Sequence, residues 1–136
     1  MYHHKLTAQI HDTDAAGVIY FANFYRMAHS TYEAFMESIG YSIRSFLDQA
    51  NVIPLIVHSE ADYKKSVKTG DRLAVELKLE KVGSSSYVIG YKIFNDQDEI
   101  AATLKTVHVS VDKEKRTKVP LPEKFKETLL EFLKTA

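Results

Sequence analysis

Hydrophobic and polar residues alternate in several parts of the chain, which is typical of strands with one buried face. The alternation covers residues 5–11, where one face carries Leu6, Ala8 and Ile10. It returns at residues 73–80 and 87–93, and a short apolar run with a central proline occupies residues 52–57. Turn-forming residues separate the consecutive segments, so the strands that they join are predicted to be antiparallel.

Residues 100–111 form another long alternating segment, but its apolar positions change parity partway along. The first part has Ile100, Ala102 and Leu104, and the second has Val107, Val109 and Val111. A β-bulge near Lys105 or Thr106 would keep both sets on one face, and the pattern therefore predicts such a bulge.

Two segments have the spacing of helices instead. Residues 22–39 carry apolar side chains three and four positions apart, and the stripe is wide enough to predict an enclosed helix. Gly40 is placed to end it, and Ser42 to begin a short second helix. Pro122 suits the first turn of a terminal helix. The apolar stripe of that last helix is Phe125, Leu129, Phe132 and Leu133.

The predicted order is a strand, a long helix, a short helix, about four strands and a terminal helix. One enclosed helix and one mostly antiparallel sheet make a two-layer α+β domain. We therefore expect a single domain over residues 1–136, with a sheet of about five strands wrapped around a long central helix.

Composition excludes several classes of protein. The 136 residues include 18 basic and 18 acidic side chains, a balance that does not favour nucleic-acid binding. No apolar run approaches the length of a membrane span, and the polar start of the chain has no signal-peptide pattern, so we expect no membrane partner. The chain has no cysteine, which fits a cytoplasmic location. The histidines show no metal-site spacing; we expect His3 and His4 in a frayed terminus, and structural roles for His29 and His108.

The segment before the long helix has the residues for chemistry. Asp12 and Asp14 lie in a loop of small residues, followed by Gly17 and the apolar residues 18–21. A helix N-terminus presents unpaired N–H groups that stabilise an oxyanion, and a carboxylate beside it can act as a nucleophile or a general base. The alternative is that both aspartates only cap and turn the chain.

The sequence from Asp12 to Phe24, Asp-Thr-Asp-Ala-Ala-Gly-Val-Ile-Tyr-Phe-Ala-Asn-Phe, resembles the signature of the 4-hydroxybenzoyl-CoA thioesterase family. The resemblance continues through residues 56–63, Gly70-Asp71 and residues 119–122. Within the family it is greatest to the 1,4-dihydroxy-2-naphthoyl-CoA thioesterases. The resemblance implies a hotdog fold and hydrolysis of an aromatic acyl-CoA thioester.

It also implies roles for individual residues. Asp14 matches the catalytic carboxylate, and the N–H of Phe21 matches the group that polarises the thioester carbonyl, with Gly17 and Tyr20 shaping the pocket. Residues of a partner subunit would complete the site, and here they are His58, Ser59 and Glu60. The basic residues proposed for the CoA phosphates are Lys64, Lys65 and Arg116. The family implies a homo-oligomer, a homotetramer built as a dimer of dimers, and no metal or other cofactor.

Other functions stay open at this point. The substrate is alternatively a short-chain acyl-CoA or an acyl-ACP thioester. A hotdog hydratase would need a histidine near Asp14, which the motif lacks. A different class is a non-catalytic acyl-CoA-binding module, against which the presence of Asp14 and Gly17 argues.

Overall fold

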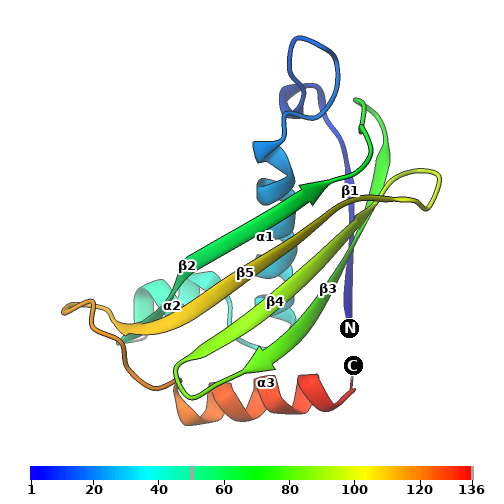
Figure 1. The fold of residues 1–136 in the computed structure, drawn as a ribbon. Helices are drawn as coiled ribbons and strands as arrows, with labels where there is room; N and C mark the ends of the chain where they lie inside the picture. The colour runs from blue at the N-terminus through cyan, green and yellow to red at the C-terminus, as the bar shows by residue number, and fades with distance from the viewer. Residues whose placement is uncertain (50, 136) are drawn as a thin grey trace.

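The protein folds as a twisted five-stranded sheet with one long helix packed against one of its faces (Figure 1). The computed structural model describes residues 1–49 and 51–135. The strands are β1 (Tyr2–Thr7), β2 (Val52–Tyr63), β3 (Arg72–Val82), β4 (Ser86–Phe94) and β5 (Ile100–Asp112). The helices are α1 (Ala22–Ser38), α2 (Ile43–Gln49) and α3 (Glu123–Thr135), and a 3-10 turn, η1, covers Ile10–Asp12. The predicted α+β class, with a central helix and antiparallel strands, is confirmed.

The helix α1 is enclosed as its wide apolar stripe predicts. Its buried side chains are Phe24, Met27, Ala28, Thr31, Tyr32, Phe35 and Met36. It ends where Gly40 takes φ +89°, a left-handed conformation that glycine adopts without steric cost. The N–H of Gly40 bonds to the carbonyl of Glu37, and the N–H of Tyr41 to that of Met36. This is a Schellman motif, which pairs carbonyls that the end of the helix would leave open.

Ser42 begins α2 as predicted, because its Oγ accepts the N–H of Ser45 at 3.2 Å. The helix α3 buries Phe125 and Leu129 and packs against β3. None of the helices in the described part of the chain is long and apolar enough to cross a membrane.

The sheet order is β1-β3-β4-β5-β2, and every neighbouring pair is antiparallel. The strand β1 lies earlier than predicted, because it pairs with β3 from Tyr2 to Thr7 and the chain then leaves the sheet in η1. His3 and His4 therefore lie in a strand and not in a frayed terminus, and Ile10 is 77% exposed instead of buried. Side-chain alternation did not reveal where the backbone stops pairing with β3.

The predicted bulge near Lys105 or Thr106 is wrong. The pairing of β5 with β4 is continuous there, and its register shifts near Ala101 instead. The inner face of β5, under α1, keeps one parity: Ala102, Leu104, Thr106, His108 and Ser110. Val107 and Val109 lie on the outer face, where Val107 pairs with Val88. Hydrophobicity placed the valines inside, but hydrogen-bonded polar side chains occupy that part of the core.

Candidate active site

The loop before α1 is a tight turn that presents Asp14. The N–H of Gly17 donates to the carbonyl of Asp14 at 3.0 Å, and the N–H of Asp14 donates to the carbonyl of Val18 at 2.9 Å. Gly17 has φ +79°, a conformation that a residue with a Cβ rarely adopts. An isolated β-bridge between Thr13 and Ile19 closes the turn, and another between Val18 and Lys68 joins it to the segment that follows β2.

The carboxylate of Asp14 is exposed and partly oriented. Its Oδ1 accepts the N–H of Ala16 at 2.8 Å, a local side-chain-to-backbone bond that fixes the direction of the group. Among the described residues, Oδ2 has no hydrogen-bond or ion-pair partner. One oxygen is therefore available to a substrate or to a water molecule.

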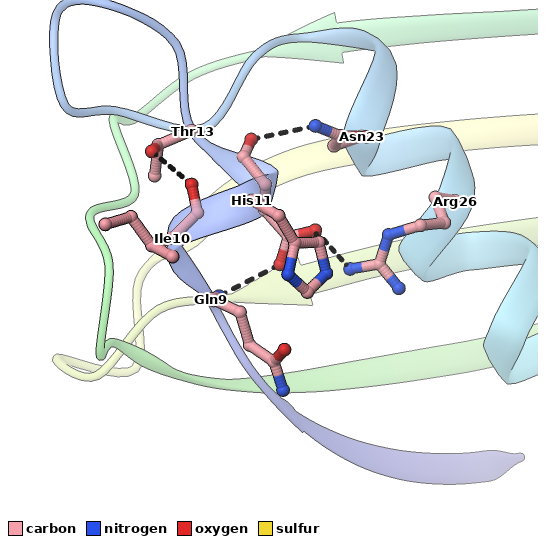
Figure 2. Close-up of polar contacts among 7 residues, drawn as sticks. Gln9, Ile10, His11, Thr13, Asn23 and Arg26 are labelled. Atoms are coloured by element: carbon pink, nitrogen blue, oxygen red, sulfur yellow. Dashed lines mark hydrogen bonds and ion pairs between the residues drawn. The ribbon is translucent and has the colours of Figure 1, made fainter.

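The other aspartate of the motif, Asp12, has a different role. Only 1% of its surface is exposed, and its carboxylate accepts hydrogen bonds from Nη2 of Arg26 at 2.7 Å and from the N–H of Gln9 at 2.9 Å (Figure 2). Its backbone carbonyl accepts a bond from Nδ2 of Asn23 at 2.8 Å and another from the N–H of Tyr20 at 3.0 Å. Asp12 thus joins the loop to the first turns of α1. The capping interpretation holds for this aspartate.

The start of α1 leaves backbone donors open beside this loop. The N–H groups of Asn23 and Phe24 bond back to the carbonyls of Tyr20 and Phe21, at 2.8 and 3.2 Å. The N–H groups of Phe21 and Ala22 have no acceptor within the described parts of the chain. Unpaired N–H groups at a helix N-terminus are the kind of donor that stabilises a developing oxyanion. The N–H of Phe21 is thus unpaired, as the predicted role requires, and so is that of Ala22; the role itself stays a prediction.

A cavity of about 290 Å³ lies at this helix end. Its walls are Val18, Ile19, Phe21, Phe24, Tyr63, Lys64, Lys65, Ser66 and Val67. The ring of Tyr63 contacts those of Phe21 and Phe24, with centroids 5.9 and 5.6 Å apart. Phe21 and Tyr20 are about half exposed, at 54% and 48%. Aromatic rings, two lysines and Phe21, whose N–H is unpaired, therefore line one opening, whereas Asp14, Gly17 and Tyr20 are not among its walls.

The residues expected from a partner subunit lie on β2, at the edge of the sheet. Side chains alternate between the faces of a strand, and paired residues share a face. Ser59 pairs with buried Thr106 and so faces α1, whereas Glu60 pairs with Lys105 on the opposite face. His58 shares that outer face, since its Nε2 is 3.1 Å from Oε1 of Glu60. Their roles stay predictions, but Ser59 alone of the three faces the helix.

The three predicted phosphate contacts are not together within one chain. Lys64 and Lys65 follow the end of β2 and line the cavity, and Nζ of Lys65 is 3.7 Å from Oε2 of Glu99. Arg116 follows β5, whose last residue pairs with the first residue of β2. It therefore lies at the other end of these strands (Figure 1), roughly 40 Å away by strand rise.

Sequence reasoning missed two positioning residues, Asn23 and Arg26. Asn23 is part of the family signature, so the sequence marked it, but the sequence did not show that its side chain bonds the carbonyl of Asp12. Arg26 had no signal, because its contact with Asp12 spans fourteen positions and depends on the angle at which the loop meets α1. Within the described residues, no group of three or more histidine, aspartate or glutamate side chains is arranged to hold a metal ion.

Comparison with known proteins supports this description. The thioesterase-like superfamily matches residues 8–129. A 1,4-dihydroxy-2-naphthoyl-CoA hydrolase of Synechococcus elongatus is 38% identical over 119 residues, 87% of each chain. The protein of that name from Rippkaea orientalis is 34% identical over 131 residues, 95% of this chain and 92% of the other. A crystal structure of a 1,4-dihydroxy-2-naphthoyl-CoA thioesterase from Synechocystis has a TM-score of 0.90 at 27% identity, covering 96% of each chain. The chain therefore belongs to the thioesterase-like superfamily.

Proposed function

We propose that this protein hydrolyses an aromatic acyl-CoA thioester to the free acid and CoA, with 1,4-dihydroxy-2-naphthoyl-CoA as the leading candidate substrate. That it is a thioester hydrolase follows from its family and from relatives that are named CoA hydrolases. The proposed site rests on the position of Asp14 near the start of α1. A carboxylate with a free oxygen, Asp14, lies in a loop bonded to the helix end where Phe21 and Ala22 have open N–H groups.

In the proposed reaction the thioester carbonyl oxygen accepts hydrogen bonds from the N–H groups of Phe21 and Ala22. These bonds strengthen as the oxygen becomes negative in the tetrahedral intermediate. In one route Oδ2 of Asp14 attacks the carbonyl carbon, CoA leaves as a thiolate, and water hydrolyses the resulting mixed anhydride. In the other route Asp14 takes a proton from water, and the hydroxide attacks and expels the thiolate. Rapid-quench mass spectrometry of the intact chain distinguishes them, since an acyl adduct forms only in the first. Neither route requires a metal or a redox cofactor.

The lining of this cavity suits a CoA thioester. Phe21, Phe24 and Tyr63 offer apolar ring surfaces to the part of the substrate beside the thioester carbonyl. Lys64 and Lys65 lie at the same opening and supply positive charge for the CoA phosphates. Arg116 is too distant to serve that opening from within the same chain.

We further propose that the protein acts as a homo-oligomer, a dimer of dimers, in the cytoplasm. The edge strand β2 exposes Ile56 and Val57, at 46% and 60%, and the backbone of an edge strand is open to pairing. Antiparallel pairing of two copies through β2 would bring the loop around Arg116 of the partner subunit toward the site. The lack of cysteine is compatible with a reducing compartment.

A direct test uses free-thiol release from 1,4-dihydroxy-2-naphthoyl-CoA, 4-hydroxybenzoyl-CoA, hexanoyl-CoA and the ACP ester of the best acyl group. We expect the aromatic CoA esters to be turned over fastest. Preference for hexanoyl-CoA or for the ACP ester would reassign the substrate class. Tight binding of the esters without thiol release would identify a non-catalytic binding module.

A further inference from the structure

A connected group of polar side chains lies in the core between α1 and the sheet. The hydroxyl oxygens of Tyr32 and Tyr87 are 2.6 Å apart, and the ring of His108 stacks on the ring of each tyrosine, with centroid distances of 4.6 and 4.8 Å. Nε2 of His108 is 2.9 Å from Oγ1 of Thr106, which in turn is 3.4 Å from the hydroxyl of Tyr91. Buried polar groups cost stability unless they are paired, so a chain of them in place of aliphatic residues calls for a reason.

This chain of hydrogen bonds ends at a second cavity. The cavity has a volume of about 290 Å³ and lies between α1, β2 and the inner face of β4 and β5. Its walls are Tyr25, Arg26, Ala28, His29, Ile56, Ser59, Tyr91 and Thr106. A cavity of about 150 Å³ in another protein holds benzene, so this one has room for a substituted or fused ring. It is at the lower limit of ligand pockets, roughly 300 Å³, and so favours a compact group over a long alkyl chain.

Tyr91 lines this cavity, and its hydroxyl keeps hydrogen-bonding capacity beyond the bond from Thr106. Burial lowers the pKa of His108 to about 3, so the ring is neutral and has a single N–H. Oγ1 of Thr106 donates to the hydroxyl oxygen of Tyr91, so its contact with His108 requires Nε2 to carry the N–H and to donate to Thr106. The O–H of Tyr91 is then left as a donor, which suits the oxygen of a phenolic hydroxyl on a substrate.

The cavity is also at a suitable distance from the proposed reaction centre. Its helical wall begins at Tyr25 and Arg26, about one turn beyond Phe21, and ends near Ala28 and His29. The rise of a helix places these residues roughly 6 to 12 Å along α1 from the N–H of Phe21. Arg26 lines the cavity and also bonds Asp12, so the loop that carries Asp14 and the cavity share one wall.

We propose that this second cavity binds the acyl group and that Tyr91, supported by Thr106, selects an aromatic ring that carries a hydroxyl group remote from the thioester. This inference rests on the proposed function and goes further, because it names the groups that determine specificity. Tyr91 contacts the ring hydroxyl, whereas Thr106 and His108 position the Tyr91 hydroxyl.

The test compares two thioesters that differ by one ring hydroxyl, 4-hydroxybenzoyl-CoA and benzoyl-CoA. We expect the wild-type protein to favour the hydroxylated ester in kcat/KM by at least about tenfold, since a site built for a hydroxyl discriminates against its absence. In Tyr91→Phe the ratio should fall to within about threefold of one, and Thr106→Val should lower it as well. The matched control is Tyr87→Phe, which removes a buried hydroxyl outside the cavity and should leave the ratio unchanged. A wild-type ratio near one, or the same change in all three variants, would overturn the proposal.

A second measurement separates this inference from the proposed function. Titration calorimetry with the thioethers 4-hydroxyphenacyl-CoA and phenacyl-CoA, which cannot be hydrolysed, measures the hydroxyl preference in binding alone. If no thioester is turned over, the proposed function fails, yet a preference that is lost in Tyr91→Phe and kept in Tyr87→Phe still supports the subsite. Equal binding of the two thioethers to the wild-type protein refutes the subsite even if hydrolysis is rapid.

Discussion

Nη2 of Arg26 donates a hydrogen bond to Oδ1 of Asp12 over 2.7 Å, and this ion pair joins the second turn of α1 to the loop that carries Asp14. Arg26 is 45% exposed at its side chain and Asp12 only 1%. The loop therefore depends on a buried carboxylate whose main cationic partner reaches it from the helix. The two aspartates of the motif thus differ: Asp12 is buried and holds the loop, whereas Asp14 is exposed and has one carboxylate oxygen without a partner among the described residues.

Breaking this pair should destabilise the protein and disturb the site. Arg26→Met leaves the buried carboxylate of Asp12 without its cation, at an expected cost of about 1–3 kcal/mol, because Arg26 is partly solvated. Urea unfolding measures the loss. The double variant Asp12→Asn/Arg26→Met should lose less than the sum of the two single variants, since neither charge is then left alone. If the loss of unfolding free energy in the double variant equals the sum of the losses in the two single variants, Asp12 and Arg26 do not stabilise each other.

Removing the free carboxylate should abolish hydrolysis without affecting the fold. In Asp14→Asn the side-chain oxygen can still accept the N–H of Ala16, so the melting temperature should hold. The rate of thiol release should fall by about 100-fold or more, because an amide is neither a nucleophile nor a base. Asp98→Asn is the matched control, a loop aspartate with φ 62°, a conformation that asparagine tolerates. Activity of Asp14→Asn within tenfold of the wild type would exclude Asp14 as the catalytic group.

The buried imidazole of His108 should make stability depend on pH. Burial lowers its pKa to about 3 in the folded protein, whereas the unfolded chain has an ordinary histidine near 6.5. Between these two pKa values the unfolded state binds one proton more than the folded state. The contribution of the neutral His108 ring to stability is therefore complete above about pH 6.5 and is lost as the pH falls toward 3. The slope is about 1.4 kcal/mol per pH unit for one proton.

The measurement for His108 is urea unfolding between pH 4 and 7. His108→Gln should be less stable at pH 7 but should have a smaller dependence on pH in this range. His3→Gln replaces an exposed histidine of β1 and should retain the wild-type slope. If the slope of His108→Gln equals that of the wild type, other groups cause the pH dependence.

The edge strand β2 should determine the assembly. A charge at Val57, an exposed apolar position on this strand, should oppose pairing of two copies. We expect Val57→Lys to reduce the mass measured by light scattering and to lower turnover, since the proposed site needs the partner subunit. Ile10→Lys places the same charge at an exposed apolar position outside β2 and should change neither. A wild-type protein that is monomeric and fully active would contradict the proposed assembly.

The sequence determined the parts of this protein that depend on local order along the chain. The three- and four-residue spacing placed α1, Gly40 and Ser42 placed its end and the start of α2, and alternation placed β3 and β4. The motif from Asp12 to Phe24 indicated the family and singled out Asp14. These features were accessible because each depends on the spacing of neighbouring residues or on backbone conformations that few residue types adopt.

Tertiary structure decided what depends on residues distant in the chain. It assigned Asp12 to the loop anchor through Arg26, and it separated Ser59 from His58 and Glu60 by face, since a single position changes the side of a strand. It placed the polar residues Thr106 and His108 under α1 and turned Val107 outward. A hydrophobic pattern cannot reveal this, because a polar side chain is buried only where other elements supply partners for it. Here Tyr91 accepts a hydrogen bond from Thr106, and Tyr32 and Tyr87 stack on the ring of His108.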